Sequence, residues 1–375
     1  MHTDTNQEAF FELVRAGLWE KEARLSLFNN IDYAAILKMA EEQSVVGLVT
    51  AGLEHVADIK VPQEWVLQFI GSTLQIEDQN KDMNDFVAKL IEKLRKEDVY
   101  AVLVKGQGIA QCYEKPLWRA SGDVDLLLSD SNYEKAKKVL LPMADNVEDE
   151  YKSFKHQGMT MKGGFVVELH GTLRSRLSRR VDKVIDDTQH NAFFGGEVRS
   201  WMNGRTSVFL PSPDNDVFFV FTHILHHFYI EGVGLRQICD WCRLLWIYRD
   251  SLSHELLESR IREAGLMTEW KAFAALAVEY LGMPVEAMPL YNENDNQSEK
   301  LKKKAERIMK FVLETGNFGH NREKTASSSY MGGKFASTFR KLKDFGHHMR
   351  IFPIDSVKFF CYFAIDGIGG AMRGE

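Results

Sequence analysis

Residues 99–128 read VYAVLVKGQGIAQCYEKPLWRASGDVDLLL, and only this segment combines short apolar runs with glycines and paired carboxylates. Residues 100–104 are apolar and rich in valine, which predicts a buried strand that ends in a turn at Lys105. Gly106 and Gly108 allow that turn to adopt a positive φ or to approach a ligand closely, and a short helix after it would direct backbone N–H groups at an anion. The turn is therefore a candidate phosphate-binding site, to which Lys105 adds positive charge.

Two aspartates open the second apolar run of this segment, GDVDLLL at residues 122–128. In a strand, Asp123 and Asp125 project from one face, while Val124 and Leu126 project from the other. Carboxylates that lie side by side repel each other and raise each other's pKa, and a hard divalent cation such as Mg²⁺ offsets that repulsion. The aspartate pair therefore predicts a metal site.

A third acidic position follows in FVVELH at residues 165–170, where Glu168 and His170 share one face of a predicted strand. If this strand lies beside the aspartate strand, three carboxylates converge in the arrangement that holds one or two metal ions over a nucleoside triphosphate. His170 is a candidate for contact with substrate or phosphate. Arg119 is a candidate for phosphate contact, because its guanidinium offers a bidentate pair of donors. The polar face of an ordinary half-buried strand gives the same alternation, so that interpretation stays open.

These residues resemble a family of nucleotidyltransferases within the DNA polymerase β superfamily. The resemblance rests on Lys105-Gly106, an arginine at 119, GDVDLL at 122–127 and ELH at 168–170, and it extends over 210–245, where Pro213, His223, Arg236 and Asp240 fit the pattern. It implies that Asp123, Asp125 and Glu168 bind Mg²⁺ or Mn²⁺, and that the glycine turn at Gly106 holds the triphosphate of ATP or another nucleotide. An NMP would then pass to a hydroxyl acceptor.

The phosphate turn departs from the pattern that the resemblance suggests. The wider superfamily usually has Gly-Ser or Gly-Gly there, whereas this chain has Lys-Gly-Gln-Gly at residues 105–108. The serine that contacts phosphate is therefore missing. Two alternatives stay open: a hydrolase or phosphotransferase that uses the same carboxylates, and a catalytically inactive nucleotide-sensing or partner-binding module on the same fold.

The composition is that of an ordinary globular protein, with 45% hydrophobic and 27% charged residues among 375. The formal net charge of −6 disfavours nucleic acid as a partner, because polynucleotide binding depends on a basic surface. We therefore expect the acceptor to be a small molecule, a sugar or a protein side chain.

Cysteine usage and the N-terminal segment bear on the compartment. Four cysteines are too few and too scattered for a disulfide framework, and they indicate a reducing environment. Cys239 and Cys242 have C-x-x-C spacing, but without a second such pair helix packing explains them better than zinc. The first twenty residues lack the basic start and apolar core of a signal peptide, and no apolar run is long enough to span a membrane. We expect a cytoplasmic protein.

The pattern of elements divides the chain into three regions. Residues 1–98 and 211–375 have helical periodicity, whereas 99–210 contains short β-like runs with one helix after the aspartate strand. The predicted class is α+β, a small mixed β-sheet nucleotidyltransferase domain flanked by N- and C-terminal α-helical regions. Further candidate strands are 151–154, 159–161 and 198–202, and a glycine- and serine-rich stretch at 315–333 is predicted to be a loop.

Three histidines of the C-terminal region lie close together in sequence. His223 shares a helix face with both His226 and His227, so the three could hold zinc with Glu231 or Asp240. The spacing lacks the glutamate of the metalloprotease signature. Helix packing, or a His223 that points toward the active-site cleft, is the favoured interpretation.

Overall fold

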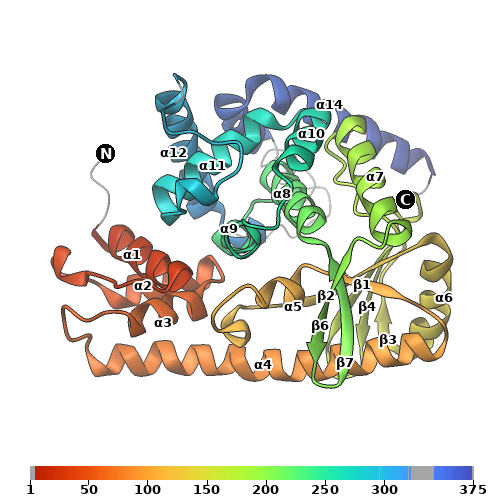
Figure 1. The fold of residues 1–375 in the computed structure, drawn as a ribbon, viewed down its shortest axis with the longest axis horizontal. Helices are drawn as coiled ribbons and strands as arrows, with labels where there is room; N and C mark the ends of the chain where they lie inside the picture. Colours follow the sequence, from red (N-terminus) through yellow and green to blue (C-terminus); the bar gives the residue numbers. More distant parts are fainter. Residues whose placement is uncertain (1–4, 295, 320, 322–341, 374–375) are drawn as a thin grey trace, which may run out of the picture.

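The computed structural model of the protein describes residues 5–294, 296–319, 321 and 342–373. Within them, the strands form one seven-stranded mixed sheet in the order β3-β4-β5-β2-β1-β7-β6 (Figure 1). The strands are β1 (Ala101–Val104), β2 (Asp123–Leu128), β3 (Ala144–Val147), β4 (His156–Met161), β5 (Val166–His170), β6 (Val198–Asn203) and β7 (Thr206–Pro211). A mixed sheet with helical regions before and after it confirms the predicted α+β class.

Helices account for most of the remaining described chain. The helices that precede the sheet are α1 (Thr5–Trp19), α2 (Tyr33–Glu42), α3 (Val46–Glu54) and α4 (Gln63–Lys96). Those that lie between the strands are α5 (Gly106–Ala110), α6 (Asp130–Leu140) and α7 (Arg179–Phe194). Those that follow the sheet are α8 (Pro213–Ile230), α9 (Leu235–Tyr248), α10 (His254–Ala264), α11 (Met267–Leu281), α12 (Ser298–Thr315) and α14 (Pro353–Arg373). The division into three domains remains a prediction.

Strand β2 lies at the centre of the sheet, antiparallel to β1 and parallel to β5. On one side of the sheet, β7 pairs in parallel with β1 and antiparallel with β6. On the other side, β4 pairs antiparallel with both β5 and β3. The register places Asp125 opposite Glu168 and Leu127 opposite His170. The structure therefore confirms that the strand of Asp123 and Asp125 lies beside the strand of Glu168, as the carboxylate hypothesis required.

The two faces of β2 have different surroundings because successive residues point to opposite sides. Val124, Leu126 and Leu128 are buried in a core that α4 and α6 complete. Leu127 lies on the opposite face with Val102 and Val104. Asp123 and Asp125 share that second face, so the strand directs its charged residues away from the larger core. Figure 1 shows α4 running from beneath the N-terminal helices to the sheet.

Helices from the two ends of the chain share one hydrophobic core. Trp19 of α1 donates a hydrogen bond from Nε1 to the carbonyl of Leu281 at 2.6 Å. Arg15 donates to the carbonyl of Tyr280 at 3.2 Å, so α1 is held at the C-terminal end of α11. The N-terminal helices are therefore packed against the C-terminal ones as well as against α4.

Two details differ from what the sequence predicts. The strand predicted at 151–154 is wrong: Lys152–Phe154 is a short 3₁₀ helix, and Lys155 with a φ of +45° turns the chain into β4. Strands β3 and β7 were not predicted. The loop predicted at 315–333 lies for the most part outside the described residues. Among the residues that the structure describes, no helix is long and apolar enough to cross a membrane.

The start of α3 packs directly on the 3₁₀ turn Pro116–Trp118, which leads into the second half of the central segment. A Cβ on Gly47 would lie 2.0 Å from the carbonyl oxygen of Trp118, closer than any real contact. We predict that Gly47→Ala lowers the free energy of unfolding by about 1–3 kcal/mol, because the helix and the turn must separate. Urea denaturation followed by circular dichroism measures the change.

Gly71 provides the matched control for that substitution. It is exposed in the middle of α4, and a Cβ there would meet nothing within 4 Å. Gly71→Ala should raise the free energy of unfolding by roughly 0.5–1 kcal/mol, because alanine favours the helix. Equal effects of the two substitutions would show that the close approach at Gly47 does not matter.

Glu269 of α11 is fully buried and accepts a hydrogen bond from the Tyr229 hydroxyl at 3.2 Å. Burial, with a smaller effect from Asp355, raises the pKa of its carboxyl to about 8. Between the ordinary pKa of 4.5 and about 8, the folded state keeps a proton that the unfolded state loses. The contribution of Glu269 to stability should therefore fall by roughly 1.4 kcal/mol per pH unit across that window.

Glu269→Gln should remove this pH dependence, because glutamine has no proton to lose. Thermal unfolding from pH 5 to pH 8 should show that the stability of the variant increases relative to that of the wild type as the pH rises. Glu299→Gln, an exposed position on α12, is the control and should leave the slope unchanged. A stability difference between the variant and the wild type that stays constant through this window would contradict a protonated Glu269.

Candidate active site

A cleft of about 510 Å³ opens on the face of the sheet that carries the charged residues. Its walls come from the ends of β1 and β2, from β4 and β5, from the loop after β5, and from helices α8 and α9. Asp123, Asp125, Glu168 and His170 line it together with Lys105. Its volume falls in the range of about 300–1,000 Å³ that is typical of small-molecule sites.

The three predicted carboxylates meet in this cleft. Asp123 and Asp125 lie on one face of β2, and Glu168 lies opposite Asp125 on β5. One oxygen from each of the three lies within 4.8 Å of the others. Asp125 is buried, with a side chain 1% exposed, whereas that of Glu168 is 28% exposed. The strand pairing thus concentrates negative charge at the wall of the cleft.

Cationic groups from the same region approach these carboxylates. Lys105 Nζ lies 2.8 Å from Asp125 Oδ1, and His170 Nε2 lies 2.7 Å from the same oxygen. His170 is also 3.4 Å from Glu168 Oε2, and His156 Nε2 is 3.2 Å from that oxygen. Lys105 and His170 therefore partly neutralise the cluster within the fold, and His156 adds a hydrogen-bonding contact to Glu168.

The balance of charges differs among the carboxyls. Repulsion by Asp125, followed by burial, raises the pKa of Asp123. Burial acts to raise the pKa of Asp125, but Lys105 and His170 outweigh it and hold that pKa below its usual value. Burial is likewise outweighed at Glu168, where hydrogen bonds from His156 and His170 hold the pKa well below its usual range. Asp123 is thus the carboxylate whose charge the protein compensates least.

The turn after β1 brings Lys105 to Asp125 at a conformational cost. Lys105 has a φ of +59° and a ψ of −147°, a region that side chains other than glycine rarely adopt, at about 1–3 kcal/mol. Gly106 follows with a φ of +41° and lines the cleft. Gly108 does not face the cleft: a Cβ there would lie 2.7 Å from Leu210 Cδ2, so this glycine lets α5 pack on β7.

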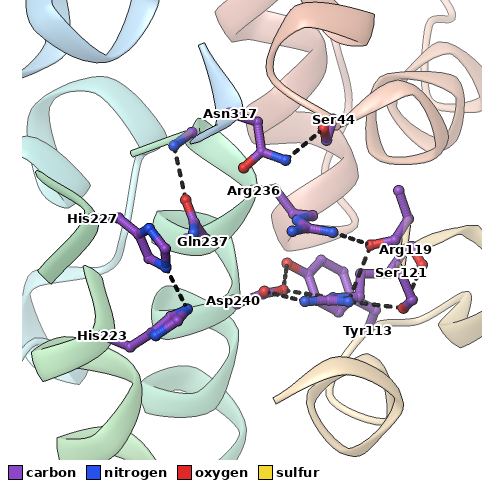
Figure 2. Close-up of polar contacts among 12 residues, drawn as sticks. Ser44, Tyr113, Arg119, Ser121, His223, His227, Arg236, Gln237, Asp240 and Asn317 are labelled. Atoms are coloured by element: carbon purple, nitrogen blue, oxygen red, sulfur yellow. Dashed lines mark hydrogen bonds and ion pairs between the residues drawn. The ribbon is translucent and has the colours of Figure 1, made fainter. Parts of the chain in front are cut away.

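Arg119 forms a buried ion pair with Asp240 of α9 (Figure 2). Its Nε and Nη2 donate to the two carboxylate oxygens at 3.1 and 2.6 Å, and Tyr113 donates to the same carboxylate at 2.8 Å. Its Nη1 donates to Ser121 Oγ at 2.8 Å and to the carbonyl of Ala120 at 3.1 Å. The structure therefore directs the donors of Arg119 into the protein, where they fix the loop before Asp123 against α9.

Arg236, one turn before Asp240 on α9, lies beside this pair and lines the cleft. It donates from Nη1 to the carbonyl of Ala120 at 2.7 Å (Figure 2). Burial, and then the neighbouring charge of Arg119, lower its pKa to about 10. It remains a cation at neutral pH and adds positive potential on the side of the cleft facing Asp123.

Two histidines of α8, His223 and His227, are hydrogen-bonded to each other (Figure 2), and Glu231 extends this chain. His227 Nδ1 lies 3.2 Å from Glu231 Oε2, and His227 Nε2 lies 3.1 Å from His223 Nε2. A carboxylate only accepts, so with both rings neutral His227 donates to Glu231 and accepts from His223. His223 Nδ1 is then the unprotonated nitrogen. Burial lowers the pKa of His223 well below its ordinary value, which favours this neutral form.

His226 has a separate role in this helix. Its Nδ1 lies 2.6 Å from the carbonyl oxygen of Ser175, in the loop after β5. Burial lowers its pKa to about 4. This neutral ring therefore ties the loop to α8, and all three histidines of the helix line the cleft.

The family model described as uncharacterised nucleotidyltransferase matches residues 29–282, about two thirds of the chain. The chain belongs to this family. The match spans the N-terminal helices from α2, the whole sheet and helices α8 to α11, so every residue that contacts the carboxylate cluster lies inside it. It confirms the resemblance on which the sequence analysis based its functional expectations.

Two further comparisons add little to this nucleotidyltransferase assignment. No curated protein matches the chain significantly. Among solved structures, an antigenic nucleotidyltransferase-like protein from Paracoccidioides brasiliensis is similar at 15% identity with a TM-score of 0.32, covering 54% of this chain and 93% of that one. A similarity at that level carries no argument about the site.

The residues of the cluster fit a divalent metal ion. Three carboxylate oxygens within reach of one another form the donor set that Mg²⁺ and Mn²⁺ take in proteins. Mutual repulsion at Asp123 means that a further cation would relieve unfavourable charge there. In this family member, Asp123, Asp125 and Glu168 are therefore the residues that could hold the ion.

His156 was not among the site residues predicted from the sequence. The predicted strand began at residue 159, whereas β4 begins at His156 and places it opposite His170. If the strand of Met159 and Met161 is extended toward the N-terminus, the alternation of side chains places His156 on the opposite face from these methionines. The sequence contains no other indication that His156 belongs to the site. Asp240 entered through the resemblance and as a possible zinc ligand, and neither of these predicted its partner 121 residues away in the sequence.

The Arg119–Asp240 pair gives a testable consequence for stability. Arg119→Met or Asp240→Leu leaves one charge buried without its partner, which should lower the free energy of unfolding by about 3–5 kcal/mol. The double variant should lose far less than the sum of the two, because neither charge remains. Chemical denaturation of the four proteins completes the cycle.

The exposed pair of Arg262 and Glu258 on α10 is the control. It has a similar 2.6 Å contact, but its side chains are 66% and 41% exposed. Removing it should change stability by at most about 0.5 kcal/mol. Additive losses at Arg119 and Asp240 would show that the two charges do not stabilise each other.

Proposed function

We propose that this nucleotidyltransferase family member transfers an NMP from a nucleoside triphosphate to a hydroxyl acceptor, with a divalent metal at Asp123, Asp125 and Glu168. The observation that carries the proposal is the meeting of these three carboxylates at the wall of the cleft. We propose a small molecule, a sugar or a protein side chain as acceptor, since a chain of net charge −6 attracts polynucleotides poorly.

The cleft residues would bind and orient the nucleotide. A divalent ion, when bound, supplies positive charge to the triphosphate oxygens and makes the α-phosphorus more electrophilic. Lys105 and Arg236 add positive potential on the same side, where negative charge develops on the departing pyrophosphate. Gly106 allows backbone amides to come close to phosphate. We assign Arg119 this general potential rather than a direct contact, because its donors face Asp240 and Ser121.

The acceptor would be oriented by groups on the other wall. Attack of its oxygen on the α-phosphorus forms one P–O bond and breaks the bond to pyrophosphate, and the hydroxyl proton must leave. Glu168 and His223 both line the cleft. The Glu168 carboxylate, and Nδ1 of His223 when the histidine pair is in the neutral tautomer described above, are hydrogen-bond acceptors for that proton. His227 and Glu231 hold the His223 ring in the tautomer that this role requires.

A second candidate is a non-catalytic module that binds a nucleotide or a partner. The observation that favours it is the internal neutralisation of the cluster, since Lys105 and His170 already contact Asp125. The absence of serine from the phosphate turn points the same way. Such a module would bind without turnover.

Calorimetric titration of ATP, GTP, CTP and UTP, with Mg²⁺ and then with EDTA, tests the proposal. We expect metal-dependent binding of at least one nucleotide, weakened more than about tenfold in Asp123→Asn/Asp125→Asn because the ion loses two ligands. Pyrophosphate release in the presence of pooled hydroxyl compounds then reports turnover.

The exposed substitution Glu299→Gln on α12 is the control and should bind as the wild type does. Binding that persists unchanged in EDTA and in the double variant would remove the metal from the proposal. Binding with metal but without pyrophosphate release would favour the sensing module, and folded protein that binds no nucleotide would favour a partner-binding one.

A further inference from the structure

Imidazole nitrogens converge with the carboxylates on the cleft face of the sheet. His156 on β4 lies directly opposite His170 on β5, and Glu168 precedes His170 by two residues on the same strand. Asp125 lies opposite Glu168 on β2. Side chains two residues apart in a strand, and those opposite one another in neighbouring strands, project from the same face. Three adjacent strands thus direct two histidines and two acids at one position.

Two of the three distances between these atoms are close to those around a bound metal ion. Glu168 Oε2 lies 3.2 Å from His156 Nε2 and 3.4 Å from His170 Nε2, and the three ligand atoms lie within 4.8 Å of one another. Ligands at about 2.0–2.2 Å around a tetrahedral ion lie roughly 3.3–3.6 Å apart. A small movement of the rings would therefore place both nitrogens and the carboxylate oxygen on one ion.

The position is accessible from the cleft. The side chains of His156, Glu168 and His170 are 25%, 28% and 12% exposed, and all three line the cleft. Three protein ligands with an open side form the coordination of catalytic rather than structural sites, because the remaining position can take water or substrate. An ion could therefore enter and still contact a bound molecule.

We propose that His156, Glu168 and His170 form a second cation site, which selects a first-row transition ion such as Mn²⁺, Co²⁺ or Zn²⁺ over Mg²⁺. Imidazole nitrogen is a good ligand for these ions, whereas Mg²⁺ prefers oxygen. The site lies beside the all-oxygen group of Asp123, Asp125 and Glu168 and shares Glu168 with it. It goes beyond the nucleotide chemistry proposed above, because it requires no nucleotide.

The test uses metal ions alone on EDTA-stripped, full-length protein. Titration with Co²⁺ should produce the visible absorption bands of nitrogen-ligated cobalt, together with shifted, exchangeable imidazole N–H signals in the proton NMR spectrum. Zn²⁺ should displace Co²⁺, and a hundredfold excess of Mg²⁺ should not. These signals come from the wild-type protein and do not depend on any variant folding.

Three substitutions separate the two cation sites. His156→Asn should weaken Co²⁺ binding by more than about 100-fold, because a direct ligand is lost. Asp123→Asn removes only an oxygen of the neighbouring group and should weaken it by less than about tenfold. His190→Asn, an exposed position on α7 outside the cleft, should have no effect. Circular dichroism and thermal unfolding confirm that each variant is folded.

Several results would overturn this inference. They are Co²⁺ spectra without nitrogen ligation, displacement of Co²⁺ by equimolar Mg²⁺, and wild-type Co²⁺ affinity in folded His156→Asn. Failure of the proposed function has a different signature, because a protein that binds no nucleotide but shows the imidazole-ligated Co²⁺ spectrum keeps this site. Nucleotide binding with Mg²⁺ and no Co²⁺ spectrum would leave only the all-oxygen group.

Discussion

The parallel pairing of β2 with β5 is the constraint on which the site depends, because it places Asp125 directly opposite Glu168. Asp123 lies two residues away on the same face, so the pairing brings three negative charges together at the wall of the cleft. Such an arrangement is unfavourable unless cations accompany it. Lys105 and His170 supply that charge at 2.8 and 2.7 Å from Asp125. The rare backbone conformation at Lys105 accompanies the contact of its ammonium group with Asp125.

The rest of the molecule holds this strand pair in place. On one face, α4 and α6 bury the apolar residues of β2 and β5, which fixes the direction of the charged ones. On the other, α9 anchors the loop before Asp123 through Asp240 and Arg119. Asn80 of α4 donates to the carbonyls of Leu117 and Arg119 at 2.8 Å, so the same loop is tied to both helical regions. Both helical regions therefore position the loop, and helices α8 and α9 of the C-terminal region also form a wall of the cleft.

Much of this arrangement could be predicted from local pattern. The alternation of Asp123 and Asp125 with Val124 and Leu126 predicted the two faces of β2, since strand periodicity is a property of the chain itself. The α+β class followed from the change of periodicity near residue 99. Strand β7 was not predicted because its strand conformation depends on pairing with both β1 and β6. Residues 152–154 form a 3₁₀ turn because the chain reverses at Lys155.

The sequence by itself therefore determined which side chains share a face and which chemistry they offer, because these depend on neighbours within a few residues. Only the tertiary structure decided what those side chains meet. Arg119 contacts Asp240, Gly108 faces Leu210 rather than the cleft, and His156 reaches Glu168, and each contact joins separate elements. Such contacts depend on the register of strands and the packing of helices, which are set by the burial of the whole core rather than by any local pattern.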